Sequence, residues 1–433
     1  MAAAFAASGL LLAALPVEAQ SGREISVPAQ AAPPGGGPTL DPAFDIDGRV
    51  VSMDEARLKV AAAEREHGHD SLELVEPLLD LAAAKARAGD FVAAAGDFAE
   101  AVRLVETLRG AMDRRLLEPL RGLGLSANAA GEYARGAEAL ERALHVMRIH
   151  NGLYHIEQRE LLDALSQSYI GLGRGEDAEF RQRAALQLAE REYGADNFRI
   201  LPAVSALADW YHDQGFFPQE RLLLEREIEL LEAARGESDP SLVGPLRALA
   251  LSYRLAYDPL PEGERALKRA LEIHALHPED RGSHAETLIA LGDWYLVFRE
   301  RMRAFDLYAE AYSLLAGDAV AAGRLDELFG SPVPLFYLQP RPPEIDENAL
   351  PEDVAQGFVL VEYAVSPIGR VVDIELIESD PPGVMDHRVV QALRGAQYRP
   401  RIAGGEPVFT SGLRLRNTFA HNEQTVEVAP PDP

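Results

Sequence analysis

Two histidines and an aspartate lie within four residues in the segment HGHD, His67–Asp70. Imidazole nitrogens and a carboxylate at this spacing could bind a metal ion, but the segment also fits a solvated link between helices, and we favour that interpretation. The sequence has no cysteine, which excludes thiolate ligands and a cysteine nucleophile. It has no HExxH, no GxxxxGK[ST] phosphate loop and no recognisable serine nucleophile motif. We therefore predict a protein that is not an enzyme and has neither a cofactor nor a metal site.

Regularly spaced leucines indicate a helical repeat. Each has an apolar residue three positions before it and a small residue directly after it, which marks one face of a helix. In most units a glycine then ends this helix, and a second helix carries alanine or glycine at positions where two antiparallel helices would touch. The leucines recur every 42 residues, at Leu81, Leu123, Leu165, Leu207, Leu249 and Leu291.

This pattern resembles the tetratricopeptide repeat (TPR), a helical hairpin whose usual period is about 34 residues. The longer period is similar to that of the TPRs of kinesin light chain and its bacterial relatives, and links such as EHGHDS and EYGADN fit that form. The resemblance implies an all-α TPR superhelix of about six hairpins over residues 51–335, in which a helix near Met53–Glu66 precedes the first full hairpin and stability is shared between neighbouring repeats.

The inner face of such a stack is lined by first-helix side chains that lie off the packing stripe. The resemblance makes these side chains candidates for gripping a peptide, although most exposed helix charges have no specific role. The matching positions are Arg121, Asp163, Gln167, Asp209, His212, Arg247, Arg254 and Asp293.

The fourth hairpin breaks the pattern of small residues with Glu220 and Glu227. A buried, unpaired carboxylate would cost several kcal/mol, so we expect this helix either to rotate or to pair its carboxylates. An acidic contact site is the functional alternative.

After the proline-rich segment Gln339–Asp346 the pattern changes to the two-residue period of β-strands. The segment SPIGR has turn chemistry, and Asp386 is expected to cap a helix that runs to about Gly395. We predict a ββαβ domain with a three-stranded antiparallel sheet. Its strand faces are expected to be Val359, Val361, Tyr363 and Val365; Val372, Ile374 and Leu376; and Phe409, Leu413, Leu415 and Phe419.

That order, with the turn glycine, the ESDPPG break and the YRP before the last strand, resembles the C-terminal domain of TonB, the energy transducer of Gram-negative bacteria. The resemblance implies a periplasmic domain, over residues 336–421, that captures a short segment of an outer-membrane transporter as an added strand. The candidate edge consists of Leu413, Arg414, Leu415 and Arg416. The alternative is that this strand only builds the core and that its edge is covered.

The start of the chain predicts export. An apolar run ends in Val17, Glu18 and Ala19, and it is shorter than the ~20 residues that span a bilayer. We predict a signal peptide over residues 1–19, although no Lys or Arg precedes the run as is usual for such signals; the alternative is a disordered apolar tail. Residues 20–50 and 422–433 are predicted to be a disordered linker and tail.

The net charge of −27 argues against nucleic acid as a partner, because a polyanion would be repelled by so acidic a protein. The sequence therefore predicts a multidomain periplasmic scaffold that binds proteins or peptides, including a transporter segment, and no small-molecule substrate. Two alternatives remain: a transducer anchored in the inner membrane by an uncleaved N-terminus, and a cytosolic TPR scaffold whose sheet is only a cap.

Overall fold

The computed structural model describes residues 24–27, 51–298, 300–317, 321–345 and 354–422. The predicted signal peptide, most of the linker and nearly all of the C-terminal tail therefore lie outside the described residues. The chain divides between Leu207 and Ala208 into two compact units, which we describe separately; the second unit also includes residues 24–27.

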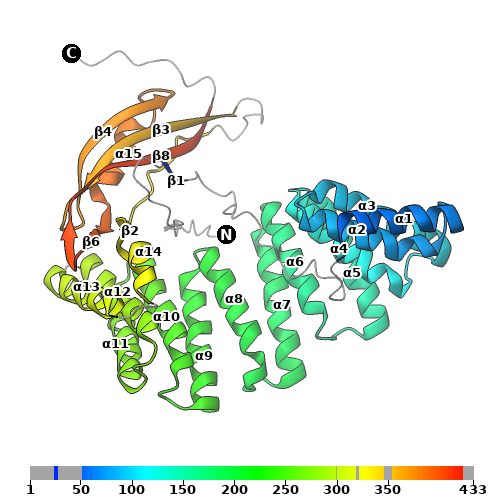
Figure 1. The fold of residues 1–433 in the computed structure, drawn as a ribbon, viewed down its shortest axis with the longest axis horizontal. Helices are drawn as coiled ribbons and strands as arrows, with labels where there is room; N and C mark the ends of the chain where they lie inside the picture. Colours follow the sequence, from blue (N-terminus) through cyan, green and yellow to red (C-terminus); the bar gives the residue numbers. More distant parts are fainter. Residues whose placement is uncertain (1–23, 28–50, 299, 318–320, 346–353, 423–433) are drawn as a thin grey trace, which may run out of the picture. The chain divides into compact units, whose positions relative to one another are not determined.

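Paired antiparallel helices build most of both units (Figure 1). The preceding helix α1, Met53–His67, agrees with the prediction. The first helices of the six hairpins are α2 (Val75–Arg87), α4 (Leu117–Ala129), α6 (Gln158–Gly171), α8 (Leu201–Asp213), α10 (Val243–Leu255) and α12 (Arg281–Val297). Their second helices are α3 (Phe91–Arg109), α5 (Tyr133–Asn151), α7 (Gly175–Tyr193), α9 (Phe217–Arg235), α11 (Pro261–Leu276) and α13 (Arg301–Ala316).

Small residues let the helices of each hairpin approach closely. A side chain added at Gly124 of α4 would meet Leu140 of α5 at 2.4 Å, so only glycine fits there. The predicted small positions of the second helices are buried in the same way, and the TPR-like fold inferred from the repeat is confirmed. These positions include Ala94, Ala101, Ala143, Ala178, Ala185, Ala270, Ala304 and Ala311.

The fifth hairpin departs from the others at its inner turn. The first four hairpins place a glycine with positive φ there, for example Gly215 at 72°. Tyr257 takes the same left-handed conformation, with φ of 52°, although its Cβ disfavours it. Its ring packs 4.6 Å from the ring of Phe336, which lies on the strand that follows the last hairpin. Tertiary packing therefore compensates for the strain of this turn.

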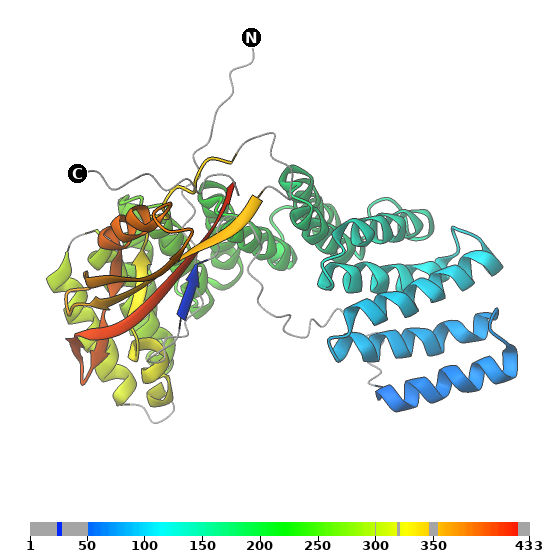
Figure 2. The same ribbon diagram turned by 90° about the horizontal axis from the view of Figure 1, so that it is seen from above.

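The C-terminal domain is built on the antiparallel strands β3 (Val354–Val365), β4 (Val371–Asp380) and β8 (Thr410–Asn422). Helix α15, Asp386–Gly395, covers one face, where Val389 and Leu393 pack against the predicted inward face of β3. This confirms the predicted ββαβ core. Figure 2 shows an additional short strand, β1 (Glu24–Val27), beside β8, so that the order of the sheet is β1-β8-β3-β4.

Three details of the domain differ from the sequence prediction. Asp373 has a φ of 52° and interrupts the alternation of β4, so Val371 and Ile374 face the core and Leu376 is exposed. Phe409 precedes β8 and is exposed, whereas Leu415 and Phe419 are buried. The residue that caps α15 is Met385; Asp386 is the first helical residue, and its Oδ2 accepts a hydrogen bond from the Gly383 amide at 3.0 Å.

Short strands join this domain to the last hairpin within the second unit. Helix α14 (Leu325–Phe329) leads into β2 (Val333–Phe336), which pairs antiparallel with β5 (Gln397–Arg399). Strands β6 (Arg401–Ala403) and β7 (Glu406–Val408) form a small hairpin that contacts α13 and α14.

Candidate functional site

The first candidate site is the edge of β8. On one side β8 pairs with β3, and on the other it pairs in parallel with β1, in the register Glu24–Arg414, Ile25–Leu415, Ser26–Arg416 and Val27–Asn417. The four residues predicted from sequence, Leu413–Arg416, thus lie on a strand whose outer backbone edge is covered by β1, as the alternative of a covered edge expected. The segment that supplies this strand falls in the region predicted to be a linker.

Side chains on the two faces of β8 differ in chemistry. Leu415 is buried in the domain core and Leu413 packs against it. Arg414 and Arg416 lie on the other face, where Arg414 donates to Glu362 of β3 at 3.0 Å and Arg416 stacks over Phe358. The edge therefore combines an apolar inner face with a basic outer face.

In the first unit, three predicted residues lie on the first helices α4 and α6. Arg121 forms an ion pair with Glu160 at 3.2 Å, and Gln167 is exposed. Asp163 is half-buried, and burial raises the pKa of its carboxyl to about 6. A carboxylate held away from water in this way would gain from a cation supplied by a partner.

In the fourth hairpin, Asp209 is exposed and His212 pairs with the glutamate that breaks the repeat pattern. The side chain of Glu220 is buried, and one of its oxygens lies 2.9 Å from Nδ1 of His212. This confirms that the structure pairs the carboxylate at the small position. Glu227 is partly exposed.

The pairing predicts a pH-dependent stability. The hydrogen bond to Glu220 raises the pKa of His212, so the ion pair stabilises the fold fully below histidine's ordinary pKa of about 6.5 and loses this effect as pH rises through the folded-state value. Between pH 5.5 and pH 8.5 we expect the natural chain to lose about 1 kcal/mol relative to Glu220→Gln. Urea denaturation of both proteins at the two pH values measures the difference; an unchanged difference would contradict the assignment.

The last two hairpins bring three predicted residues together. Arg247 and Arg254 of α10 and Asp293 of α12 line a cavity of about 370 Å³, together with apolar side chains such as Ile289 and Trp294. These charges are engaged within the chain. Arg254 donates to the backbone carbonyl of Leu335 in β2 at 3.1 Å.

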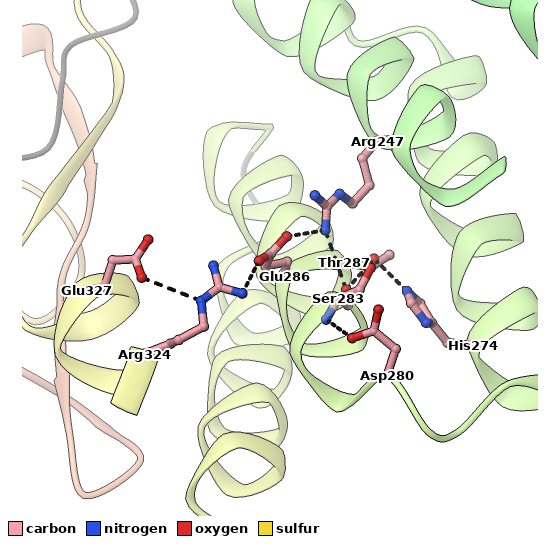
Figure 3. Close-up of polar contacts among 8 residues, drawn as sticks. All are labelled: Arg247, His274, Asp280, Ser283, Glu286, Thr287, Arg324 and Glu327. Atoms are coloured by element: carbon pink, nitrogen blue, oxygen red, sulfur yellow. Dashed lines mark hydrogen bonds and ion pairs between the residues drawn. The ribbon is translucent and has the colours of Figure 1, made fainter. Parts of the chain in front are cut away.

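Figure 3 shows that Arg247 belongs to a row of alternating charges. Arg247 and Arg324 each lie 2.5 Å from a carboxylate oxygen of Glu286, and Arg324 also pairs with Glu327. Burial raises the pKa of Glu286, but the two guanidinium groups outweigh burial and hold this pKa below its ordinary value. The row joins α10 to α12 and to the segment around α14.

Asp293 is buried against the C-terminal domain. Both of its carboxylate oxygens accept from Nη1 of Arg399, at 3.2 and 3.1 Å, and the hydroxyl of Tyr308 donates to it at 2.8 Å. Burial lowers the pKa of nearby Arg254, consistent with a site poor in water. The roles of Arg399 and Tyr308 were not predicted from the sequence. Arg399 belongs to the short motif YRP, and nothing in this motif indicates that its partner is Asp293, a carboxylate far away in the sequence.

The geometry defines a chain of TPR-like helical hairpins joined to a small sheet domain, both of them architectures that bind proteins. More particularly, residues 352–419 match the model of the family described as Gram-negative bacterial TonB protein C-terminal. No curated protein sequence matches the chain. Within the described residues, no helix has the length and apolarity to cross a membrane, and no group of His, Asp and Glu is arranged to hold a metal ion.

Solved structures with similar folds cover the helical part. BtubC (BKLC) from P. vanneervenii is 24% identical, covers 53% of this chain and 91% of its own, and has a TM-score of 0.40. The nearly identical TPR-like repeats of a putative kinesin light chain from Podosopora anserina are 17% identical, with 48% and 96% coverage and a TM-score of 0.39. The tetratricopeptide repeat sensor protein PH0952 from Pyrococcus horikoshii, a signal transduction ATPase, is 15% identical, with 64% and 44% coverage and a TM-score of 0.42.

Proposed function

We propose that this protein is a non-enzymatic adaptor of the bacterial periplasm that joins two protein partners. The TonB-like domain captures one partner as a strand along β8, and the inner faces of the TPR-like hairpins bind another. The observation that supports this most strongly is the backbone edge of β8, which already accepts a parallel strand from elsewhere in the chain. The candidate residues on the first helices, Asp163 and Gln167 among them, remain a proposed surface for the second partner.

Site-specific photo-crosslinking in the native envelope tests the strand-binding half. A photoreactive residue at the exposed position Ser411, near the start of β8, is expected to yield a discrete crosslinked protein. The matched control carries the same group at the exposed position Glu375 on β4, the opposite edge strand among the described strands of this sheet. Crosslinks at Glu375 alone, or at neither position, would contradict binding along β8.

The match to the TonB family supports a second candidate, an energy transducer attached to the inner membrane. The two proposals differ in the N-terminus of the native protein. A mature chain that starts near Gln20 and fractionates with the periplasm supports the adaptor, and an intact N-terminus in the inner membrane supports the transducer. A C-terminal phosphatase fusion that stays inactive would contradict both.

A further inference from the structure

The strand that covers β8 comes from the chain's own N-terminal region. Nearly the whole length of the sequence separates β1 (Glu24–Val27) from β8, and the pairing between them is parallel. The other strand pairs of this sheet, β3 with β4 and β3 with β8, are antiparallel, and a short turn joins β3 to β4. A parallel strand from a distant segment instead has the geometry of a captured peptide.

One backbone edge can hydrogen-bond only one strand at a time. We infer that β1 is an exchangeable occupant of the site, and that a partner segment must displace β1 before it can pair with β8. This inference rests on the proposed function and deepens it, because it states both the regulation of the edge and the kind of segment that the edge accepts.

The register indicates the chemistry of that segment. An acidic residue, Glu24, lies level with Arg414, and an apolar residue, Ile25, lies level with Leu415. The outer face of β8 carries Arg414 and Arg416, and Arg414 already shares its charge with Glu362. A partner strand of the same class would run parallel to β8, be short, alternate polar and apolar residues, and carry no positive charge facing the arginines.

Tethering gives β1 an advantage over free partners. Because β1 belongs to the same chain as β8, their pairing is intramolecular and does not depend on the protein concentration. A partner therefore binds only if its own contacts, or its local concentration, exceed this internal competition. The occupant thus sets a threshold for binding.

The experiment uses the full chain with Ile25→Pro and Ser26→Pro together. Proline has no N–H to donate to the neighbouring strand, and successive amides of a strand point to opposite sides, so one of the two prolines always removes the amide that faces β8. The matched control is Ala32→Pro, which extends the existing Pro33–Pro34 run. Hydrogen exchange of the segment 410–422 is read by mass spectrometry. We expect the double variant to lose protection at the β8 amides that face β1, while the amides that face β3 stay protected and the control matches the natural chain.

A second readout uses a labelled synthetic peptide of residues 22–29, GREISVPA. It is expected to bind the double variant at least about tenfold more tightly than the natural chain or the control, because the internal competitor has been removed. Unchanged exchange in the double variant, or equal or absent peptide binding, would overturn the inference. Protection that rises with protein concentration would also overturn it, since the strand would then come from a second copy. Failure of the envelope crosslinking at Ser411, with these two results intact, would count against the proposed function alone.

Discussion

Replacing Asp293 by alanine is expected to lower the free energy of unfolding of the second unit by about 3–5 kcal/mol. The substitution removes the carboxylate that accepts from Arg399 and from Tyr308, and both partners are buried. The guanidinium of Arg399 would then be a buried charge without compensation, while Arg254 lies close enough to repel it. Urea denaturation followed by tryptophan fluorescence measures the change, because Trp294 is adjacent to the site.

The repeat supplies a matched control for this prediction. Asp209 occupies the same position two repeats earlier, on α8, and is exposed. Asp209→Ala is expected to change the free energy of unfolding by no more than about 0.5 kcal/mol. The double variant Asp293→Leu with Arg399→Met should recover most of the loss, since replacing both members of a buried pair by apolar groups is often neutral. Equal effects of Asp293→Ala and Asp209→Ala would show that the buried pair has no special role.

Gly369→Ala is expected to destabilise the C-terminal domain by about 3 kcal/mol or more, the range of a core overpacking combined with backbone strain. Gly369 has a φ of 74°, and a Cβ added there would lie 2.1 Å from the backbone oxygen of Tyr398. That oxygen cannot move easily, because the Tyr398 amide donates to the Gly369 carbonyl at 2.9 Å and fixes the turn against β5. Thermal denaturation monitored by circular dichroism measures the loss.

Gly383 separates the two contributions to this effect. It has a similar φ of 83°, but an added Cβ would meet nothing within 4 Å. Gly383→Ala therefore carries only the conformational penalty, and we expect a loss of about 1 kcal/mol. If the two alanine variants were equally stable, the close approach between the turn and β5 would be absent in solution.

The repeat made the helical part of the fold predictable. A pattern that recurs six times identifies helices more reliably than a single helix can. The spacing of Leu81 and its equivalents therefore predicted the hairpins and their buried small positions, and the helix before them was also predicted. The two-residue period of Val359 to Val365 similarly predicted the inward face of β3. The bulge at Asp373 was not predictable, because a residue with positive φ leaves no sign in an alternating pattern.

The candidate site was less accessible from sequence. Position within the repeat selected Asp293 and Asp209 equally, yet one is buried in an ion pair and the other is exposed. The difference depends on Arg399, which a distant part of the chain supplies. The pairing of β1 with β8 likewise joins segments whose local sequences do not identify each other as partners. Local patterns predict elements, whereas contacts between distant elements depend on tertiary packing.

The pairing of β2 with β5 affects how the protein can be dissected. The segment that matches the TonB family starts at residue 352, after β2 has ended at Phe336. A fragment cut at that boundary would leave the backbone of β5 without its neighbour and Arg399 without Asp293. Such a fragment would expose to solvent the unpaired backbone edge of β5, which promotes aggregation, and the guanidinium of Arg399 without its carboxylate partner. A recombinant form of the C-terminal domain should therefore start at α10, because the last two hairpins and β2 supply the contacts that its β5 strand and Arg399 need.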